Sequence, residues 1–200
     1  MEEIKYIKDK GLQVFNYDFV EKYSAMDVQI NLDKQCGLKY VIDNQGHRLY
    51  VSRKMTDKEI VDYYRGICME QDKESPHLYI DEQLSGKSYR TILDLGGAEG
   101  NFTLGLIEQI EEAYIFECDK NWIEALEHTF APWRNKVHLI EKFVSDKSYD
   151  DHIKLDDFKE LREKKIDLIK MDIEGEELNA IKGAKEILKE NSQCILLACL

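Results

Sequence analysis

The chain has 200 residues, a formal net charge of −12 and 43% hydrophobic residues, which is the composition of one folded domain with a hydrophobic core and room for a small appendage. The acidic balance argues against nucleic acid and anionic membranes as partners, because both are bound through clustered Lys and Arg. The charged N-terminal segment and the lack of a bilayer-length apolar run predict a cytoplasmic protein. The five cysteines lack C-x-x-C spacing, so free thiols are expected and a zinc site is not.

Residues 1–84 are predicted to form a small N-terminal α+β extension. Two short apolar runs in residues 38–53 flank a D-N-Q-G turn, a pattern typical of a β-hairpin. Residues 56–72 follow as a predicted helix, in which Thr56 and Glu59 have the spacing of a capping box. We expect this extension to be distinct from the remainder of the chain.

Residues 85–200 alternate between short apolar runs and amphipathic segments, which predicts a doubly wound, mostly parallel α/β sheet with helices on both faces. In such a sheet the fourth strand lies beside the first, and ligands bind outside the carboxyl ends of the strands. The helix before the fifth strand is expected over residues 176–190. The strands are expected at residues 90–97, 113–119, 136–145, 166–172 and 193–200.

The turn after the first strand, ILDLGGAEGNF, predicts a nucleotide-type cofactor site. The dinucleotide fingerprint would need glycines at Ala98 and Asn101, so NAD is disfavoured. An acid at the strand end with spaced glycines instead suits S-adenosylmethionine, which has no pyrophosphate. The alternative is a helix cap and a tight turn without a ligand. The candidate cofactor-binding residues in this turn are Asp94, Gly96, Gly97, Gly100, Asn101 and Phe102.

Glu117 lies 23 residues after Asp94, at the end of the second strand. A carboxylate at this place is expected to accept the ribose hydroxyls of the cofactor. Cys118 beside it would contact the adenine. The alternative is that Glu117 is merely solvated.

Four carboxylates occupy six positions after the fourth strand, at Asp172, Glu174, Glu176 and Glu177. Glu176 and Glu177 suit the first turn of a helix, where negative charge is favourable. Asp172 and Glu174 precede that helix and are expected to face the reactive end of the cofactor. They are our candidates for a catalytic base, and Asp172 also for a cofactor contact. Direct contact is favoured over a divalent cation, because two acids make a thin metal site; a further alternative is that Asp172 only fixes the turn.

From about residue 90 onwards the chain resembles a class I S-adenosylmethionine-dependent methyltransferase of the FkbM type. The matching segments are DLGGAEGNFTL, FECD, VSDK, KLDDF and IDLIKMDIEGEELNAIKGA, in that order. The resemblance implies a Rossmann-like sheet of order 3-2-1-4-5 and O-methyl transfer to sugars, sugar-bearing small molecules or polysaccharides. It also implies that Ser145 and Asp146 lie near the adenine, with a simple turn as the alternative reading of that segment.

Class I sheets have two further strands after the fifth, and these are missing here. Residues 193–200 would then form an exposed apolar edge strand, which natural proteins avoid. We therefore expect either a fragment of a longer protein or a partner chain, such as a second copy in a homo-oligomer, over this edge. A non-catalytic cofactor-binding or interaction module is the alternative to an active enzyme.

Overall fold

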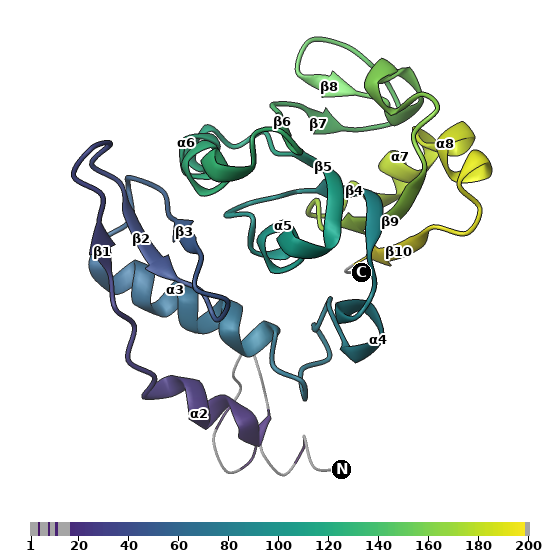
Figure 1. Ribbon diagram of the computed structural model, residues 1–200. Helices are drawn as coiled ribbons and strands as arrows, with labels where there is room; N and C mark the ends of the chain where they lie inside the picture. The colour runs from purple at the N-terminus through teal and green to yellow at the C-terminus, as the bar shows by residue number, and fades with distance from the viewer. Residues whose placement is uncertain (1–3, 5–7, 9–10, 12–16, 199–200) are drawn as a thin grey trace.

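The computed structural model describes residues 4, 8, 11 and 17–198 (Figure 1). Its centre is a five-stranded sheet of order β10-β9-β4-β5-β6 in which every neighbouring pair is parallel. In chain order this is 3-2-1-4-5, so the predicted doubly wound α/β topology is confirmed. The strands are β4 (Tyr89–Leu95), β5 (Ile110–Phe116), β6 (Val137–Ile140), β9 (Ile166–Met171) and β10 (Ile195–Ala198).

Helices cover both faces of this sheet because successive side chains of a strand point to opposite faces. Ile92 and Ile115 pack in one hydrophobic cluster with residues of α5 and α6, whereas Leu93 and Phe116 pack in another with residues of α7 and α8. Figure 1 shows these two helix pairs on opposite sides of the strands. The helices are α5 (Asn101–Gly105), α6 (Lys120–Thr129), α7 (Glu177–Lys182) and α8 (Lys185–Glu190).

The N-terminal part contains the predicted hairpin and helix. The hairpin strands pair antiparallel, and a further short strand, β1, extends them to a three-stranded sheet. The capping box is formed, since the Glu59 amide donates to the Thr56 hydroxyl at 3.3 Å and the Thr56 amide donates to the Glu59 carboxylate at 2.8 Å. The elements are η1 (Asp18–Val20), α2 (Glu21–Ser24), β1 (Asn31–Leu32), β2 (Lys39–Ile42), β3 (Arg48–Tyr50), α3 (Asp57–Glu70) and α4 (Glu82–Ser85).

The extension packs directly on the parallel sheet. Leu49 and Ile60 belong to the same hydrophobic cluster as Ile92 and Ile115 of the sheet. The Tyr50 amide also donates a 3.0 Å hydrogen bond to the Thr129 hydroxyl at the end of α6. The predicted boundary between residues 84 and 85 therefore does not separate two hydrophobic cores.

Two predicted elements are wrong in their extent. The third strand ends at Ile140, and the rest of the expected run forms β7 (Phe143–Val144), which pairs with β8 (His152–Ile153) outside the main sheet. The helix expected over 176–190 breaks at Gly183 into α7 and α8. Gly183 lies so close to β7 that an added Cβ would stand 2.1 Å from the Ser145 carbonyl oxygen. Periodicity does not reveal such contacts, because they join distant segments.

Short 3-10 turns connect several of these elements. Helix α5 after the glycine turn ends at Gly105, and η2 connects it to β5. Asp156 accepts from the Glu186 and Ile187 amides at 3.1 and 3.0 Å and so caps α8. The 3-10 turns of this half are η2 (Ile107–Gln109), η3 (Ala131–Trp133), η4 (Leu155–Asp157) and η5 (Lys159–Leu161).

Candidate active site

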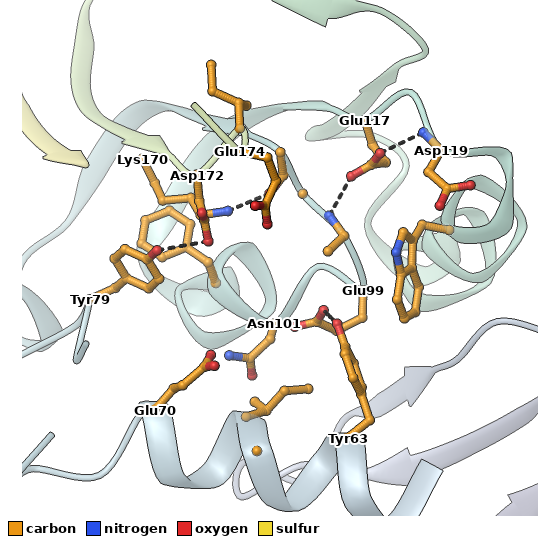
Figure 2. Close-up of a pocket in the computed structure, with 18 of the residues that line it drawn as sticks. Tyr63, Glu70, Tyr79, Glu99, Asn101, Glu117, Asp119, Lys170, Asp172 and Glu174 are labelled. Carbon is orange, nitrogen blue, oxygen red and sulfur yellow. Dashed lines mark hydrogen bonds between the residues drawn. The ribbon is translucent and has the colours of Figure 1, made fainter. Parts of the chain in front are cut away.

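A cavity of about 1030 Å³ opens beyond the carboxyl ends of β4, β5 and β9 (Figure 2). The glycine turn after β4, the segment after β5 and the acidic segment after β9 form one side. Helix α3 of the N-terminal extension forms the other. The volume is at the upper end of the range for small-molecule sites, so the cavity has room for a cofactor and an acceptor together.

The glycines of the turn are required by packing. Gly96 has φ +77°, and an added Cβ would lie 1.9 Å from the Asp172 carbonyl oxygen. At Gly97 the Cβ would meet Ile115 at 2.2 Å, and at Gly100, with φ +88°, it would meet Phe130 at 2.6 Å. Backbone of Gly96 and Gly97 lines the cavity, whereas Gly100 lies behind it. The turn is thus packed tightly against Ile115 of β5 and against the residues that follow β9 and α6.

The Glu117 carboxylate connects the end of β5 to this turn through hydrogen bonds. One carboxylate oxygen accepts from the Ala98 amide at 2.8 Å, and the other accepts from the Cys118 and Asp119 amides at 2.7 Å each. The bond to Ala98 supports an unusual backbone conformation, since Ala98 has φ +44°. A carboxylate has about four acceptor sites, so Glu117 keeps about one for a ligand.

Asp94 and Lys170 form a buried ion pair below the turn. Lys170 on β9 lies 3.2 Å from Asp94 on β4, and it also donates to the Gly96 carbonyl oxygen. Asp94 accepts a 2.8 Å hydrogen bond from the Thr103 hydroxyl, and it does not line the cavity. Burial alone would lower the pKa of Lys170, but the carboxylates of Asp94 and Asp172 outweigh burial and raise it. Lys170 therefore lines the cavity as a cation at neutral pH.

Lys170 was missed by sequence reasoning, although a signal was present. A lysine inside the apolar run IDLIKMD is unexpected in a strand that is buried on both faces. Its exposed fraction is 5%. A buried charge needs a partner, and the register of the sheet supplies one by pairing Asp94 with Lys170 on adjacent strands.

The four carboxylates after β9 differ in their surroundings, and Glu176 is exposed and accepts from the Asn179 side-chain amide at 2.8 Å. Asp172 and Glu174 line the cavity, and the Tyr79 hydroxyl donates to Asp172 at 3.0 Å. Glu177 is buried, and its carboxylate accepts from the Ile173 and Gly175 amides at 3.1 and 3.3 Å. Glu177 therefore holds the shape of the loop that presents Asp172 and Glu174.

Glu174 has a left-handed backbone conformation, with φ +54°. Glutamate rarely adopts this conformation, and such residues cluster at functional sites. The adjoining Gly175 has φ +96° and open space around its Cα. The loop therefore turns sharply and leaves the Glu174 side chain at the cavity.

A hydrogen bond of 2.5 Å from the Tyr63 hydroxyl to the Glu99 carboxyl group joins α3 to the glycine turn (Figure 2). Burial raises the pKa of Glu99, which favours its protonated form. Tyr63 also stacks on Trp122 of α6, with ring centroids 5.4 Å apart. The sequence analysis selected neither Tyr63 nor Glu99 as a site residue, because their contact depends on how α3 docks.

The remaining predicted cofactor residues fall into two groups. Asn101, Phe102 and Cys118 line the cavity. Ser145 and Asp146 do not; the Ser145 amide donates to the Ile153 carbonyl oxygen at 2.9 Å between β7 and β8. Phe143 of the same segment lines the cavity in their place. Among the described residues, no group of three or more His, Cys, Asp or Glu is arranged to hold a metal ion.

The model of the methyltransferase FkbM domain matches residues 93–198, just over half of the chain. The chain belongs to the FkbM methyltransferase family. The family segment begins within β4 and ends with β10, so it contains the glycine turn, Glu117 and the loop of Asp172 and Glu174. Helix α3, which forms the opposite wall of the cavity, lies outside it.

Among solved structures, one match is to a "putative RNA methyltransferase" from Pyrococcus horikoshii. The two are 14% identical, the match covers 66% of this chain and 63% of that chain, and the TM-score is 0.37. No curated protein matches this chain in sequence. Within the described part of the chain, no helix has the length and apolarity needed to cross a membrane.

Proposed function

We propose that this FkbM methyltransferase transfers a methyl group from S-adenosylmethionine to a hydroxyl oxygen of a sugar or sugar-bearing acceptor. The observation that carries the proposal is the convergence of Glu117, the glycine turn and the loop of Asp172 and Glu174 on one cavity. The choice of a sugar hydroxyl is supported by the family resemblance and by the carboxylates available to take its proton.

The residues at the β5 side of the cavity fit the nucleoside of this cofactor. Glu117 keeps about one acceptor site, and Asp119 beside it uses only one carboxylate oxygen, which accepts from the Asn121 amide at 2.8 Å. The carboxylates of Glu117 and Asp119 accept hydrogen bonds from the ribose hydroxyls. Cys118 and Phe143 offer the apolar surface that an adenine needs. The acidic lining suits a sulfonium, which is positively charged.

The residues at the β9 side fit the methyl transfer. When bound, S-adenosylmethionine supplies an electrophilic methyl carbon, whose bond to sulfur breaks with its electron pair left on sulfur as the bond to the acceptor oxygen forms. Asp172 or Glu174 accepts the hydroxyl proton of the acceptor. The Tyr79 hydroxyl orients Asp172, and Glu177 holds the loop. Lys170 attracts the carboxylate of the cofactor's methionine part.

Calorimetric titration with S-adenosylhomocysteine tests the cofactor assignment, with NAD as the competing ligand. We expect micromolar affinity for S-adenosylhomocysteine, loss of at least about tenfold in Glu117→Ala, and no binding of NAD. Glu111→Ala is the matched control, because Glu111 is exposed at the opposite end of the same strand. Binding of NAD alone, or equal affinities in the two variants, would overturn the assignment.

A further inference from the structure

Glu99 is a buried carboxyl group at the edge of the cavity. It lies on the glycine turn, its exposed fraction is 8%, and it lines the cavity. Glutamate is almost never buried to this extent unless it is paired. The turn serves the cofactor through its backbone, so a buried acidic side chain on it needs a further explanation.

Tyr63 of α3 fixes the orientation of this carboxyl group. The Tyr63 hydroxyl donates to Oε2 of Glu99 at 2.5 Å (Figure 2), and the Tyr63 ring is itself held by its stack on Trp122. No other side chain that the structure describes donates to Glu99, whose remaining neighbour is its own backbone amide. A carboxylate has about four acceptor sites, so Glu99 can accept further hydrogen bonds from a ligand in the cavity.

The charges around Glu99 favour a cationic ligand. Burial raises the pKa of Glu99, and of its charged neighbours Lys170 on β9 opposes this rise while Asp94 on β4 adds to it. The Lys170 ammonium lies 3.2 Å from Asp94, and in the described part of the chain no cationic side chain forms an ion pair with Glu99. A cation from a ligand would therefore stabilise the charged form of Glu99 more than the protein does by itself.

The position of Glu99 near Lys170 suits an α-amino acid group. Lys170 is assigned to the carboxylate of the cofactor's methionine part, and it donates to the Gly96 carbonyl oxygen of the same turn that carries Glu99. In an α-amino acid the amino nitrogen and the carboxylate carbon are bonded to one carbon and lie only about 2.5 Å apart. A ligand whose carboxylate contacts Lys170 therefore brings its ammonium group to this end of the cavity as well.

Building on the proposed function, we propose that the Glu99 carboxylate binds the protonated amino group of the cofactor's methionine part, next to the carboxylate that Lys170 attracts. Each charge of the amino acid group then meets an opposite charge of the protein. The hydroxyl of Tyr63 holds Glu99 in place from the other wall. Because α3 lies outside the family segment, the N-terminal extension supports cofactor binding through this bond.

The test is calorimetric titration of the full chain with S-adenosylhomocysteine, its deaminated analogue and its decarboxylated analogue. We expect wild type to bind S-adenosylhomocysteine at least about tenfold more tightly than the deaminated analogue, as one charge-assisted hydrogen bond allows. Glu99→Gln should lose at least about tenfold in affinity for the two ligands that carry the amino group. Its affinity for the deaminated analogue should stay within about twofold of wild type.

Glu127→Gln is the matched control, because Glu127 is exposed on α6, does not line the cavity and loses the same single charge. All three affinities should be unchanged in this variant. Equal binding of S-adenosylhomocysteine and the deaminated analogue by wild type would overturn the inference without recourse to any variant. Unchanged affinities in Glu99→Gln would overturn it as well.

Two further outcomes would assign Glu99 a different role and so overturn the inference. An equal loss for all three ligands in Glu99→Gln would show that the bond to Tyr63 only joins α3 to the turn. Loss of the preference for the amino group in Asp172→Asn, with the preference kept in Glu99→Gln, would assign the amino group to Asp172. Failure of the wild-type chain to bind S-adenosylhomocysteine would instead overturn the proposed function, on which the inference rests.

Discussion

The Tyr63 hydroxyl donates a 2.5 Å hydrogen bond to the Glu99 carboxyl group, and this bond links the wall formed by α3 to the turn that follows β4. The two residues are 36 positions apart in the chain. Glu99 is buried, and burial raises the pKa of its carboxyl group. The protonated form is therefore favoured more than it would be in water. The N-terminal extension is in this way part of the wall of the candidate active site.

The buried Glu99 should make stability depend on pH. Its pKa is raised by burial, while Lys170 and Asp94 act on it in opposite directions. The folded state holds the proton more tightly than the unfolded state, so the contribution of Glu99 is greatest below its unfolded pKa of about 4.3 and falls as pH rises towards the folded pKa. The side chain of Glu99→Gln cannot ionise. The free energy of unfolding of this variant should therefore rise relative to that of wild type as pH rises. Urea unfolding from pH 4 to 8 measures this; parallel pH curves would contradict it.

Two glycines should respond oppositely to the same substitution. Gly96→Ala places a methyl group 1.9 Å from the Asp172 carbonyl oxygen at a positive φ, so we expect a loss of more than about 2 kcal/mol in the free energy of unfolding. Gly66→Ala adds a methyl group in open space within α3 and should stabilise by about 0.5–1 kcal/mol. Urea unfolding of both variants decides the matter. Similar effects at the two sites would show that the glycine turn is not packed as described.

The roles of Asp172 and Glu174 can be separated from cofactor binding. If either carboxylate accepts the acceptor's proton, Asp172→Asn or Glu174→Gln should lower kcat by about 10²- to 10⁴-fold. The affinity for S-adenosylhomocysteine should change far less, because the substitutions keep the side-chain shape. Single-turnover kinetics with an acceptor, alongside calorimetry, measure both quantities. Full activity in both variants would remove the catalytic role of this loop.

Asp72 should stabilise the junction of α2 and α3. It accepts hydrogen bonds from the Tyr23 hydroxyl at 2.5 Å, the Glu74 amide at 2.9 Å and the Lys22 ammonium at 2.9 Å. These contacts, led by Tyr23, lower the pKa of Asp72 from 3.8 to about 2. At pH 7 this shift contributes about 2 kcal/mol to the free energy of unfolding. The contribution is present above the unfolded pKa of Asp72 and is lost as pH falls towards 2.

Asp72→Asn should therefore be less stable than wild type at pH 7, and the difference should shrink as pH falls below about 4. Urea unfolding at pH 7, 5 and 3 tests this expectation. The exposed Asp27 provides the matched control as Asp27→Asn, for which little change is expected. A difference that does not vary with pH would mean that Asp72 acts through packing rather than through its charge.

Local sequence patterns were sufficient for much of the fold. The capping box of Thr56 and Glu59 formed because both partners lie within one helical turn. The parallel sheet followed from apolar runs that alternate with helices, since parallel strands need crossover connections, whereas the strand order 3-2-1-4-5 was implied by the family resemblance. The two classes of acid after β9 also followed from position, because Glu177 lies in a helix and Asp172 at a strand end.

The contacts between distant segments were decided by the tertiary structure alone. Lys170 meets Asp94 through the register of β9 and β4, and β7 leaves the main sheet for β8. Periodicities of 2 and 3.6 residues report which face of an element is apolar, but not which other element covers it. The sequence alone therefore located the glycine turn, Glu117 and Asp172. The docking of α3, driven by burial of Ile60 and its neighbours, placed the wall that contains Tyr63 opposite them.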